Sequence, residues 1–311
     1  MKILNDYSWV RGVNYNPKPA DQVRRELGYG KRVNLNQVRF WCSPYAYQKD
    51  KVGYIEKIRE FIRVCHECGY GTMPILFNGN GLNPAMLEPE FRQEIGDEYA
   101  AAMVNAFKDE PGLFIWDIMN EPCCNPWIDA CQDEEEKMAR KLKTREFVKY
   151  YCKFVKKLDP VNAITVGYTV AAELELFAEE VEEDVISFHD YNPTRALVDA
   201  NYRLADEIGK KYGKPVMQTE TGCLARSNPY DVALQACEKY HMGWYLFELM
   251  IFGRCDSEHG IFYPDGTVRD PATIAAMMGC YRNRGEGIIV GLPNREGAAE
   301  NAIEKIKKLN K

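Results

Sequence analysis

The sequence has no long apolar run and no excess of positive charge. No stretch of its 311 residues approaches the ~18 apolar residues that a membrane span requires. Lys and Arg number 40 against 46 Asp and Glu, which gives a net charge of -6, and the basic residues are scattered among the acidic ones. Binding to nucleic-acid phosphates needs a basic stripe instead. We therefore expect neither a membrane partner nor a nucleic-acid partner.

Histidine is also scarce. The four histidines are His66, His189, His241 and His259. They form no HxH or HExxH motif of the kind that binds catalytic zinc. Cys65 and Cys68 form a single CxxC on a stretch with helical spacing, and no second CxxC accompanies it. We expect no metal site, with a zinc site at this CxxC as the minor alternative to ordinary core or surface thiols.

Eleven cysteines are an odd number and too sparse for a disulfide scaffold, so reduced thiols are expected. The first residues, Met1 to Asp6, lack the apolar run of a signal peptide, which indicates a cytoplasmic protein. No Pro/Ser-rich linker divides the chain. We expect one catalytic domain over residues 1–311 without a separate carbohydrate-binding module, and a monomer or small homo-oligomer. The segment 296–311 is predicted to be a terminal amphipathic helix.

Short apolar runs alternate with helical patterns along the chain, which is typical of parallel βα units. Most runs lack strict alternation, as strands covered on both faces should. The runs are Trp9 to Tyr15, Asn36 to Trp41, Gly71 to Phe77, Leu113 to Asn120, Ala163 to Gly167, Val185 to Tyr191, Pro215 to Glu220 and Gly243 to Leu249. Eight such units in a chain of this length predict an α/β protein with a (β/α)8 TIM-barrel fold.

Two glutamates directly follow strands of this predicted barrel. The run from Leu113 leads into Asn120-Glu121-Pro122, and Pro122 ends the strand. The run from Pro215 leads into Glu220 in the same way, three strands later. Because the strands of a barrel end at one rim, we expect Glu121 and Glu220 to face each other across it. Loops at this rim are also longer and richer in aromatic, Asn and Pro residues.

Glycoside hydrolysis uses such a pair of carboxyl groups, one to protonate the leaving oxygen and one to attack the anomeric carbon. The two groups lie about 5 to 5.5 Å apart in enzymes that retain configuration. Repulsion between close carboxylates should separate their pKa values, so that one stays protonated near neutral pH. The alternative is that Glu121 and Glu220 are solvated loop acids, although this pattern is hard to obtain by chance.

With these residues the sequence resembles the clan of barrel glycosidases that carries its acid/base after strand four and its nucleophile after strand seven. The resemblance is greatest to glycoside hydrolase family 5 and spans nearly the whole chain. It depends on the Asn-Glu-Pro tripeptide after Trp116-Asp117 and on Glu220 at the end of strand seven. The resemblance implies a retaining mechanism without a cofactor, with Glu121 as acid/base and Glu220 as nucleophile.

The resemblance also implies residues that support this pair. Arg39, inside the second apolar run, would orient Glu220 and keep it ionised. Asn120 would donate a hydrogen bond to the sugar 2-hydroxyl. His189 and Tyr191 resemble the His-x-Tyr of the family, in which His lies on the acid/base side and Tyr touches the nucleophile. An ordinary ion pair for Arg39 and a structural role for His189 are the alternatives.

Two positions depart from the family pattern. Asn78 follows Phe77 where members often have His, and Phe247 stands where most have a Trp that binds the glycone sugar. Glu248, as the next strand residue, is expected to point to the opposite face and form a structural ion pair, with a third acid at the barrel mouth as the alternative. Aromatic faces and amides suit sugar rings and hydroxyls. The candidate substrate contacts are Asn14, Tyr15, Trp41, Tyr45, Asn78, Trp127, Phe247 and Tyr263, with plain loop packing as the alternative for about half of them.

The sequence thus predicts a retaining β-glycosidase whose partner is a carbohydrate substrate. By analogy with the family we favour a β-1,4-glucan or β-mannan. Endo action and exo action, as in a β-mannosidase on short oligosaccharides, both remain open. A non-catalytic carbohydrate-binding barrel is the alternative from another class, and a metal-dependent barrel hydrolase is the third.

Overall fold

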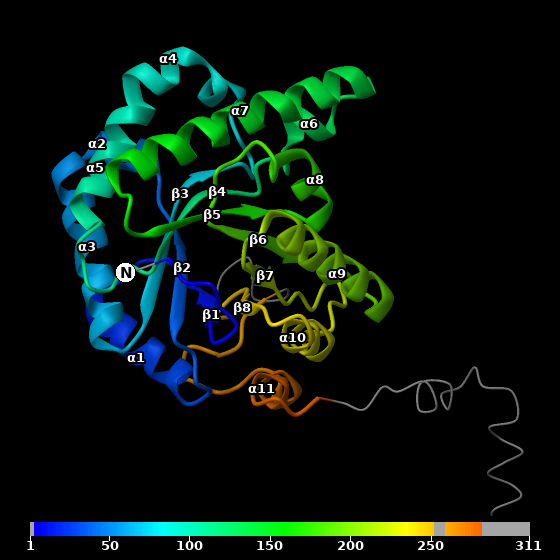
Figure 1. The fold of residues 1–311 in the computed structure, drawn as a ribbon. Helices are drawn as coiled ribbons and strands as arrows, with labels where there is room; N and C mark the ends of the chain where they lie inside the picture. Colours follow the sequence, from blue (N-terminus) through cyan, green and yellow to red (C-terminus); the bar gives the residue numbers. More distant parts are fainter. Residues whose placement is uncertain (1–2, 252–258, 282–311) are drawn as a thin grey trace, which may run out of the picture.

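The computed structural model describes residues 3–251 and 259–281, and they form a closed parallel barrel with helices around it (Figure 1). Each strand pairs with the next along the chain, and β8 pairs with β1. The strands are β1 (Arg11–Asn14), β2 (Gln37–Trp41), β3 (Gly71–Asn78), β4 (Ile115–Asn120), β5 (Ala163–Tyr168), β6 (Val185–Asp190), β7 (Val216–Thr221) and β8 (Gly243–Leu246). This confirms the predicted (β/α)8 fold. The helix predicted at 296–311 lies outside the described residues.

Several of the helices that surround the barrel begin or end at capping residues. The α-helices are α1 (Ala20–Lys31), α2 (Pro44–Lys49), α3 (Lys51–Glu67), α4 (Pro89–Phe91), α5 (Asp97–Phe107), α6 (Pro126–Asp129), α7 (Glu134–Leu158), α8 (Leu174–Phe177), α9 (Arg195–Tyr212), α10 (Tyr230–Lys239) and α11 (Pro271–Met277). The side chains of Asp50, Asp133 and Thr194 accept hydrogen bonds from the first turns of α3, α7 and α9. Gly213, with φ of 64°, takes the left-handed conformation that ends α9.

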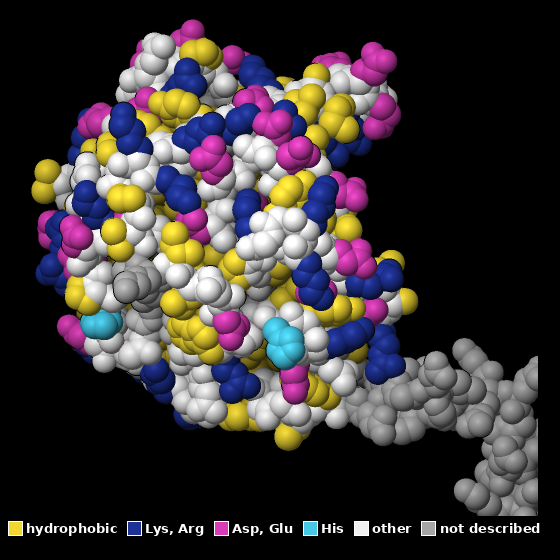
Figure 2. All heavy atoms as spheres, viewed as in Figure 1, with side chains coloured by type: hydrophobic (Ala, Val, Ile, Leu, Met, Phe, Trp, Pro, Cys, Tyr) yellow, Lys and Arg dark blue, Asp and Glu magenta, His cyan; other side chains and the backbone are white. Residues whose placement is uncertain are grey.

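Apolar side chains fill two separate layers. One lies between the sheet and the helices and includes Leu76, Phe107 and Val148, all fully buried. The other fills the barrel interior and includes Met73, Met217 and Tyr245. Acidic and basic side chains are interspersed on the face shown in Figure 2, with no gathering of one sign. None of the described helices has the length and apolar character needed to cross a bilayer.

The carboxyl-terminal ends of three strand pairs are irregular. The register shifts between Asp117 and Asn120 in β4, between Phe188 and His189 in β6, and between Gln218 and Thr221 in β7. Bulges of this kind re-aim side chains and are common beside active sites. The irregularities therefore lie on the strands that carry Asn120, His189 and Glu220, at the rim where the sequence places the functional residues.

Candidate active site

Glu121 follows β4 in a conformation that few residues adopt. Its φ is +45°, and its backbone N–H donates to the carbonyl of Gly167 at 2.7 Å. A non-glycine residue in this region costs on the order of 1–3 kcal/mol, and such strain is concentrated at functional sites. Gly79 permits the close approach of the β3 loop, because a Cβ at that position would lie 2.2 Å from the Glu121 carbonyl oxygen. The backbone thus holds Glu121 in one place at the rim.

Glu220 lies in β7, and two donors fix its carboxylate. Arg39 Nη1 donates to Oε1 at 2.7 Å, and the Tyr191 hydroxyl donates to Oε2 at 3.0 Å. The carboxylate is therefore oriented on both oxygens, by a charge from β2 and a hydroxyl from the loop after β6. These are the contacts that the resemblance implies for the nucleophile.

Arg39 is fully buried and connects the strands beneath the rim. Besides Glu220, its guanidinium donates to Asp117 Oδ2 from Nε at 2.9 Å, to Asn14 Oδ1 at 3.1 Å and to Asn120 Oδ1 at 2.8 Å. Burial lowers the pKa of Arg39, but the charges of Asp117 and Glu220 outweigh burial and raise the pKa above its ordinary value. A buried charge of this kind persists only when it is paired and hydrogen-bonded. Arg39 therefore remains a cation next to Glu220.

Glu121 has its own pair of donors. Asn80 Nδ2 donates to Oε2 at 2.9 Å, and Nδ1 of the fully buried His189 lies 3.0 Å from Oε1. Burial raises the pKa of Glu121, but the hydrogen bond and charge of His189, the Asn80 hydrogen bond and the charge of Arg39 lower the pKa to about 2. Glu121 is therefore not the carboxyl that was expected to stay protonated near neutral pH. Hydrogen bonds to the ionised form and the neighbouring positive charges outweigh the effect of burial.

The two carboxylates share one cavity. Ligand atoms of Glu121, His189 and Glu220 all lie within 4.8 Å of one another. This spacing is close to the separation typical of retaining enzymes and well below the roughly 6.5–9.5 Å of inverting ones. The cavity has a volume of about 610 Å³, within the usual range for small-molecule sites. It is lined by Asn80, Glu121, Cys124, Thr169, Val170, Tyr191, Asn192, Glu220, Arg226, Phe247 and His259.

Several candidate substrate contacts lie in or beside this cavity. Phe247 lines the cavity, and its ring packs edge-on against Trp41 and His259 with centroid distances of 5.8 and 4.8 Å. Asn78 accepts a hydrogen bond from Asn120 Nδ2 at 2.9 Å. The polar contact at the end of β3 is thus an amide pair.

The structure places the other candidates elsewhere. Asn14 is fully buried and accepts from Arg39, so it positions the guanidinium rather than reaching the cavity. Tyr15 is wrong as a substrate contact, because its side chain is buried toward α1 and its hydroxyl donates to Glu26 at 2.7 Å. Three candidates lie outside the cavity lining. Tyr45 packs against Phe91 and Trp127 against Arg140, whereas the side chain of Tyr263 is exposed.

The expectation for Glu248 was also wrong. β8 ends at Leu246, so the alternation of strand side chains does not extend to Glu248. Among the described residues Glu248 has no ion pair. Burial raises the pKa of Glu248 to about 7, partly opposed by the charge of Lys18 and increased by that of Glu220. Glu248 is therefore a buried acid within the electrostatic reach of the site.

Sequence reasoning missed several residues of the site. Asp117 could have been found, because it is the one charged residue within an otherwise apolar strand and needs a partner there. Asn80, Asn192, Arg226 and His259 lie on loops that line the cavity. Loop residues follow no hydrophobic period, and the sequence offers no signal that distinguishes these four from solvated neighbours.

Glu121, His189 and Glu220 also form the one cluster in the described part of the chain with the spacing of a metal site. The carboxylate oxygens that would bind the metal, however, already accept hydrogen bonds. Those of Glu220 accept from Arg39 and Tyr191, and one of Glu121 accepts from Asn80. The guanidinium 2.7 Å from Glu220 supplies the positive charge that a cation would bring. Cys65 of the CxxC is buried within α3, and Cys68 is the C-cap residue of that helix. Neither belongs to a group of described residues with the spacing of a metal site.

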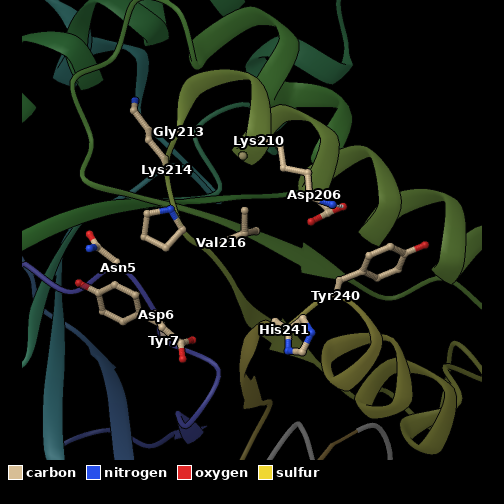
Figure 3. A pocket seen from close by; sticks show the side chains of 12 residues that line it. Asn5, Asp6, Tyr7, Asp206, Lys210, Gly213, Lys214, Val216, Tyr240 and His241 are labelled. Atoms are coloured by element: carbon tan, nitrogen blue, oxygen red, sulfur yellow. Dashed lines mark hydrogen bonds and ion pairs between the residues drawn. The ribbon is translucent and has the colours of Figure 1, made fainter.

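A second cavity of about 500 Å³ lies at the opposite end of the barrel (Figure 3). Lys214 and Val216 at the start of β7 line it together with Tyr240 and His241 before β8. Asp206, also in its wall, is paired with Lys210 at 2.6 Å. Barrel enzymes carry their active sites at the carboxyl ends of the strands. The cavity that holds Glu121 and Glu220 is therefore the candidate active site.

Comparisons with known proteins agree with this geometry. A model of the cellulase family, glycosyl hydrolase family 5, matches residues 15–253. No curated protein matches the sequence significantly. Among solved structures, the endo-1,4-β-D-mannanase of Thermotoga petrophila RKU-1 is similar, with a TM-score of 0.66 and 14% identity over 87% of this chain and 99% of that one.

Two further structures share the fold at low identity. An exo-β-1,4-mannosidase from Opitutaceae bacterium strain TAV5 has a TM-score of 0.67 and 17% identity, over 86% of this chain and 58% of that one. A Bacteroidetes-affiliated cellulase of the family has a TM-score of 0.65 and 12% identity, over 90% of this chain and 94% of that one. Such low identities establish the fold alone, whereas the family model covers most of the chain. The chain therefore belongs to glycosyl hydrolase family 5 and is a retaining β-glycosidase.

Proposed function

We propose that Glu220 is the nucleophile and Glu121 the acid/base of a double-displacement hydrolysis of β-linked glycans. The observation that carries the proposal is the different set of partners around two carboxylates within 4.8 Å of each other. Arg39 and Tyr191 orient Glu220, whereas Asn80 and His189 hold Glu121. A nucleophile must stay ionised, and the permanent charge of Arg39 favours that state on Glu220.

In the first step a Glu220 oxygen attacks the anomeric carbon while the bond to the leaving oxygen breaks and Glu121 gives that oxygen its proton. In the second step Glu121 takes a proton from water, the water oxygen attacks the same carbon, and the ester bond to Glu220 breaks. Asn120 supports both steps. One N–H of its amide is donated to Asn78, and the second N–H has no acceptor among the described residues and can bind the sugar 2-hydroxyl.

Glu121 must carry a proton when the glycosidic bond breaks, and the side chain of His189 lies beside its carboxyl group. Nδ1 and Oε1 are 3.0 Å apart, and His189 Nε2 has no hydrogen-bond partner among the described residues. Substrate that covers the cavity removes water from Glu121 and favours the neutral carboxyl. The proton then resides on Glu121 when the glycosidic bond breaks.

The direct test is hydrolysis of aryl β-glycosides by the Glu220→Gln variant, with the anomer of the first product followed by NMR for the unmodified enzyme. We expect loss of activity in the variant and a β product from the unmodified enzyme. Hydrolysis by Glu220→Gln at the original rate, or an α product, would rule out the mechanism. Correct folding of the variant is checked by its unfolding temperature.

A β-1,4-glucan or β-mannan is the first substrate class to test. Its support is the family and the fold shared with solved mannanases, a mannosidase and a cellulase. Phe247 offers an apolar face for a sugar ring without the N–H of an indole. Product sizes from polysaccharide and from short oligosaccharides separate endo from exo action.

A metal-dependent hydrolase is the second candidate function, because Glu121, His189 and Glu220 have suitable spacing. The cation Arg39 beside Glu220 opposes metal binding. Activity that EDTA abolishes and a divalent cation restores would favour the metal. Activity unaffected by EDTA favours the double displacement.

The compartment is proposed to be reducing, as in the cytoplasm. Its support is that the ten cysteines in the described part of the chain are free thiols and that several, such as Cys65 and Cys152, are buried. Thiol titration of the unfolded protein purified without reductant, together with size-exclusion chromatography for the oligomeric state, tests these points.

A further inference from the structure

Arg226 is a charged residue in the wall of the active-site cavity that the proposed mechanism does not use. It lies in the loop between β7 and α10, six residues after Glu220, and its side chain is exposed. The guanidinium lies over the ring of Tyr191, with Cζ 4.9 Å from the ring centroid. One aromatic ring and one hydrogen bond therefore separate Arg226 from the Glu220 carboxylate.

No carboxylate among the described residues pairs with Arg226. The two acids of the cavity are already engaged, Glu220 with Arg39 and Tyr191, and Glu121 with His189 and Asn80. The guanidinium is thus held from one side by the Tyr191 ring, while its N–H groups have no acceptor within the described part of the chain. This leaves a positive charge, unpaired among the described residues, in the wall of a cavity that otherwise offers mainly amides, hydroxyls, aromatic faces and the two engaged carboxylates.

A guanidinium differs from the groups that recognise neutral sugars. Amides such as those of Asn80 and Asn192 suit hydroxyl groups, whereas the two parallel N–H groups of Arg match the two oxygens of a carboxylate. An acidic sugar would also be repelled by Glu220, and a cation close to that residue offsets the repulsion. The arrangement is therefore suited to a substrate that carries its own negative charge.

We infer that Arg226 binds the carboxylate of a uronic acid unit, so that the enzyme prefers β-linked glycans that contain acidic sugars. This inference rests on the proposed function of the same cavity. It adds the substrate class and a residue that determines specificity. Sulfated sugars share the negative charge but not the planar two-oxygen geometry, and the experiment separates them from uronic acids.

The test compares matched pairs of substrates. Each aryl β-D-uronide is compared with the neutral glycoside of the same configuration: the glucuronide with the glucoside, the galacturonide with the galactoside, and the mannuronide with the mannoside. The corresponding 6-sulfated glycosides are tested beside each pair. Arg226→Gln is expected to lower the uronide-to-neutral ratio of kcat/KM by about ten- to a hundredfold, the effect of losing hydrogen bonds to a charged group. Arg226→Lys, which keeps the charge without the paired N–H groups, should fall between.

Arg92→Gln is the matched control. Arg92 also lies over a tyrosine ring, that of Tyr150 at 4.4 Å, but it does not line the active-site cavity. Its replacement should leave the ratio unchanged. An equal loss on uronides and neutral glycosides in Arg226→Gln would instead show that Arg226 only positions Tyr191, and this result overturns the inference.

Binding is measured separately so that the inference does not depend on hydrolysis. Calorimetry of the unmodified enzyme and Arg226→Gln uses sodium D-glucuronate, D-galacturonate and D-mannuronate against glucose, galactose and mannose. Tighter binding of a uronate that depends on Arg226 supports the inference even if no glycoside tested is cleaved, in which case only the proposed function fails. Hydrolysis of neutral glycosides without binding or cleavage of any uronide overturns the inference and leaves the proposed function standing. Preference for the sulfated glycosides alone also overturns it.

Discussion

The proposed acid/base role of Glu121 leads to a prediction that separates it from the proposed nucleophile, Glu220. Glu121→Gln removes the proton that the leaving oxygen needs, while the side chain keeps its size between Asn80 and His189. The 2,4-dinitrophenolate anion can leave without being protonated, whereas an alkyl alcohol leaves only when its oxygen receives a proton. We therefore expect Glu121→Gln to reduce kcat/KM strongly for an alkyl β-glycoside and only slightly for the dinitrophenyl β-glycoside.

The expected size follows from the contacts of Glu121. Two hydrogen-bond donors, Asn80 Nδ2 and His189 Nδ1, face the carboxylate of Glu121. A Gln side chain can accept from one of them through its oxygen, but its NH2 group then faces the other donor. This mismatch costs on the order of 1 kcal/mol, but it affects both substrates and cancels in their ratio. General acid catalysis contributes about 100- to 10,000-fold. The ratio of the two kcat/KM values should therefore change by that factor, or about 3 to 5 kcal/mol.

The assay is steady-state kinetics of both glycosides, with the first turnover followed by the release of dinitrophenolate. A burst is expected in Glu121→Gln, because formation of the ester with Glu220 remains fast while its hydrolysis lacks a base. Glu220→Gln serves as the comparison and should lose activity on both glycosides. Equal losses on the two glycosides in Glu121→Gln would refute the assignment of this residue as the acid.

Three further predictions concern the residues around the pair. Tyr191→Phe removes the 3.0 Å hydrogen bond to Glu220 and should lower kcat/KM by about ten- to a hundredfold at an unchanged unfolding temperature; unchanged kinetics would show that this bond is dispensable. Gly79→Ala places a Cβ 2.2 Å from the Glu121 carbonyl oxygen and should lower kcat, whereas Gly28→Ala, with no atom within 4 Å, should not; equal activity of the two variants contradicts the close approach. Burial raises the pKa of Glu183 to about 8. Between about pH 4.5 and 8 Glu183 is therefore ionised in the unfolded chain but protonated in the folded protein, so the free energy of unfolding falls as pH rises. Glu183→Gln should remove this loss of stability. In urea unfolding the variant should be more stable than the unmodified protein at pH 8, by on the order of 4 kcal/mol, but not at pH 5. The same difference at both pH values would contradict a buried neutral carboxyl.

The barrel and the position of the acidic pair could be predicted because both depend on local order in the sequence. An apolar run buried on both faces ends where a polar residue follows it, and this marks Asn120-Glu121 and Glu220 as rim residues. The same reasoning applies to Arg39, which an apolar strand tolerates only with a partner. Tyr15 shows the limit of this reasoning. It directly follows the end of β1, and the loop conformation there decides whether its side chain points into the cavity or toward the helices. Its hydroxyl turned to Glu26 of α1 instead of the cavity.

The protonation of the pair could not be predicted from the sequence, because it depends on contacts between distant residues. Repulsion between two carboxylates alone would raise the pKa of one of them. Asn80 and His189, 41 and 68 residues from Glu121 along the chain, bring hydrogen bonds and charge that reverse the direction. The end of β8 at Leu246 similarly breaks the strand alternation on which the prediction for Glu248 depended. In both cases the decisive geometry arises only when the barrel closes.

The division between strands and loops explains why the reaction was easier to predict than the substrate. The residues proposed to act on the glycosidic bond lie in strands or directly after them, where burial restricts which polar residues can occur. Residues that can recognise the sugar, such as Asn192, Arg226 and His259, lie on loops, where a charged residue is ordinarily solvated and carries no pattern. Arg226 differs from a solvated residue only because Tyr191 holds it in the cavity wall. Substrate preference in this enzyme should therefore change with loop substitutions that leave Glu121, Glu220 and Arg39 in place.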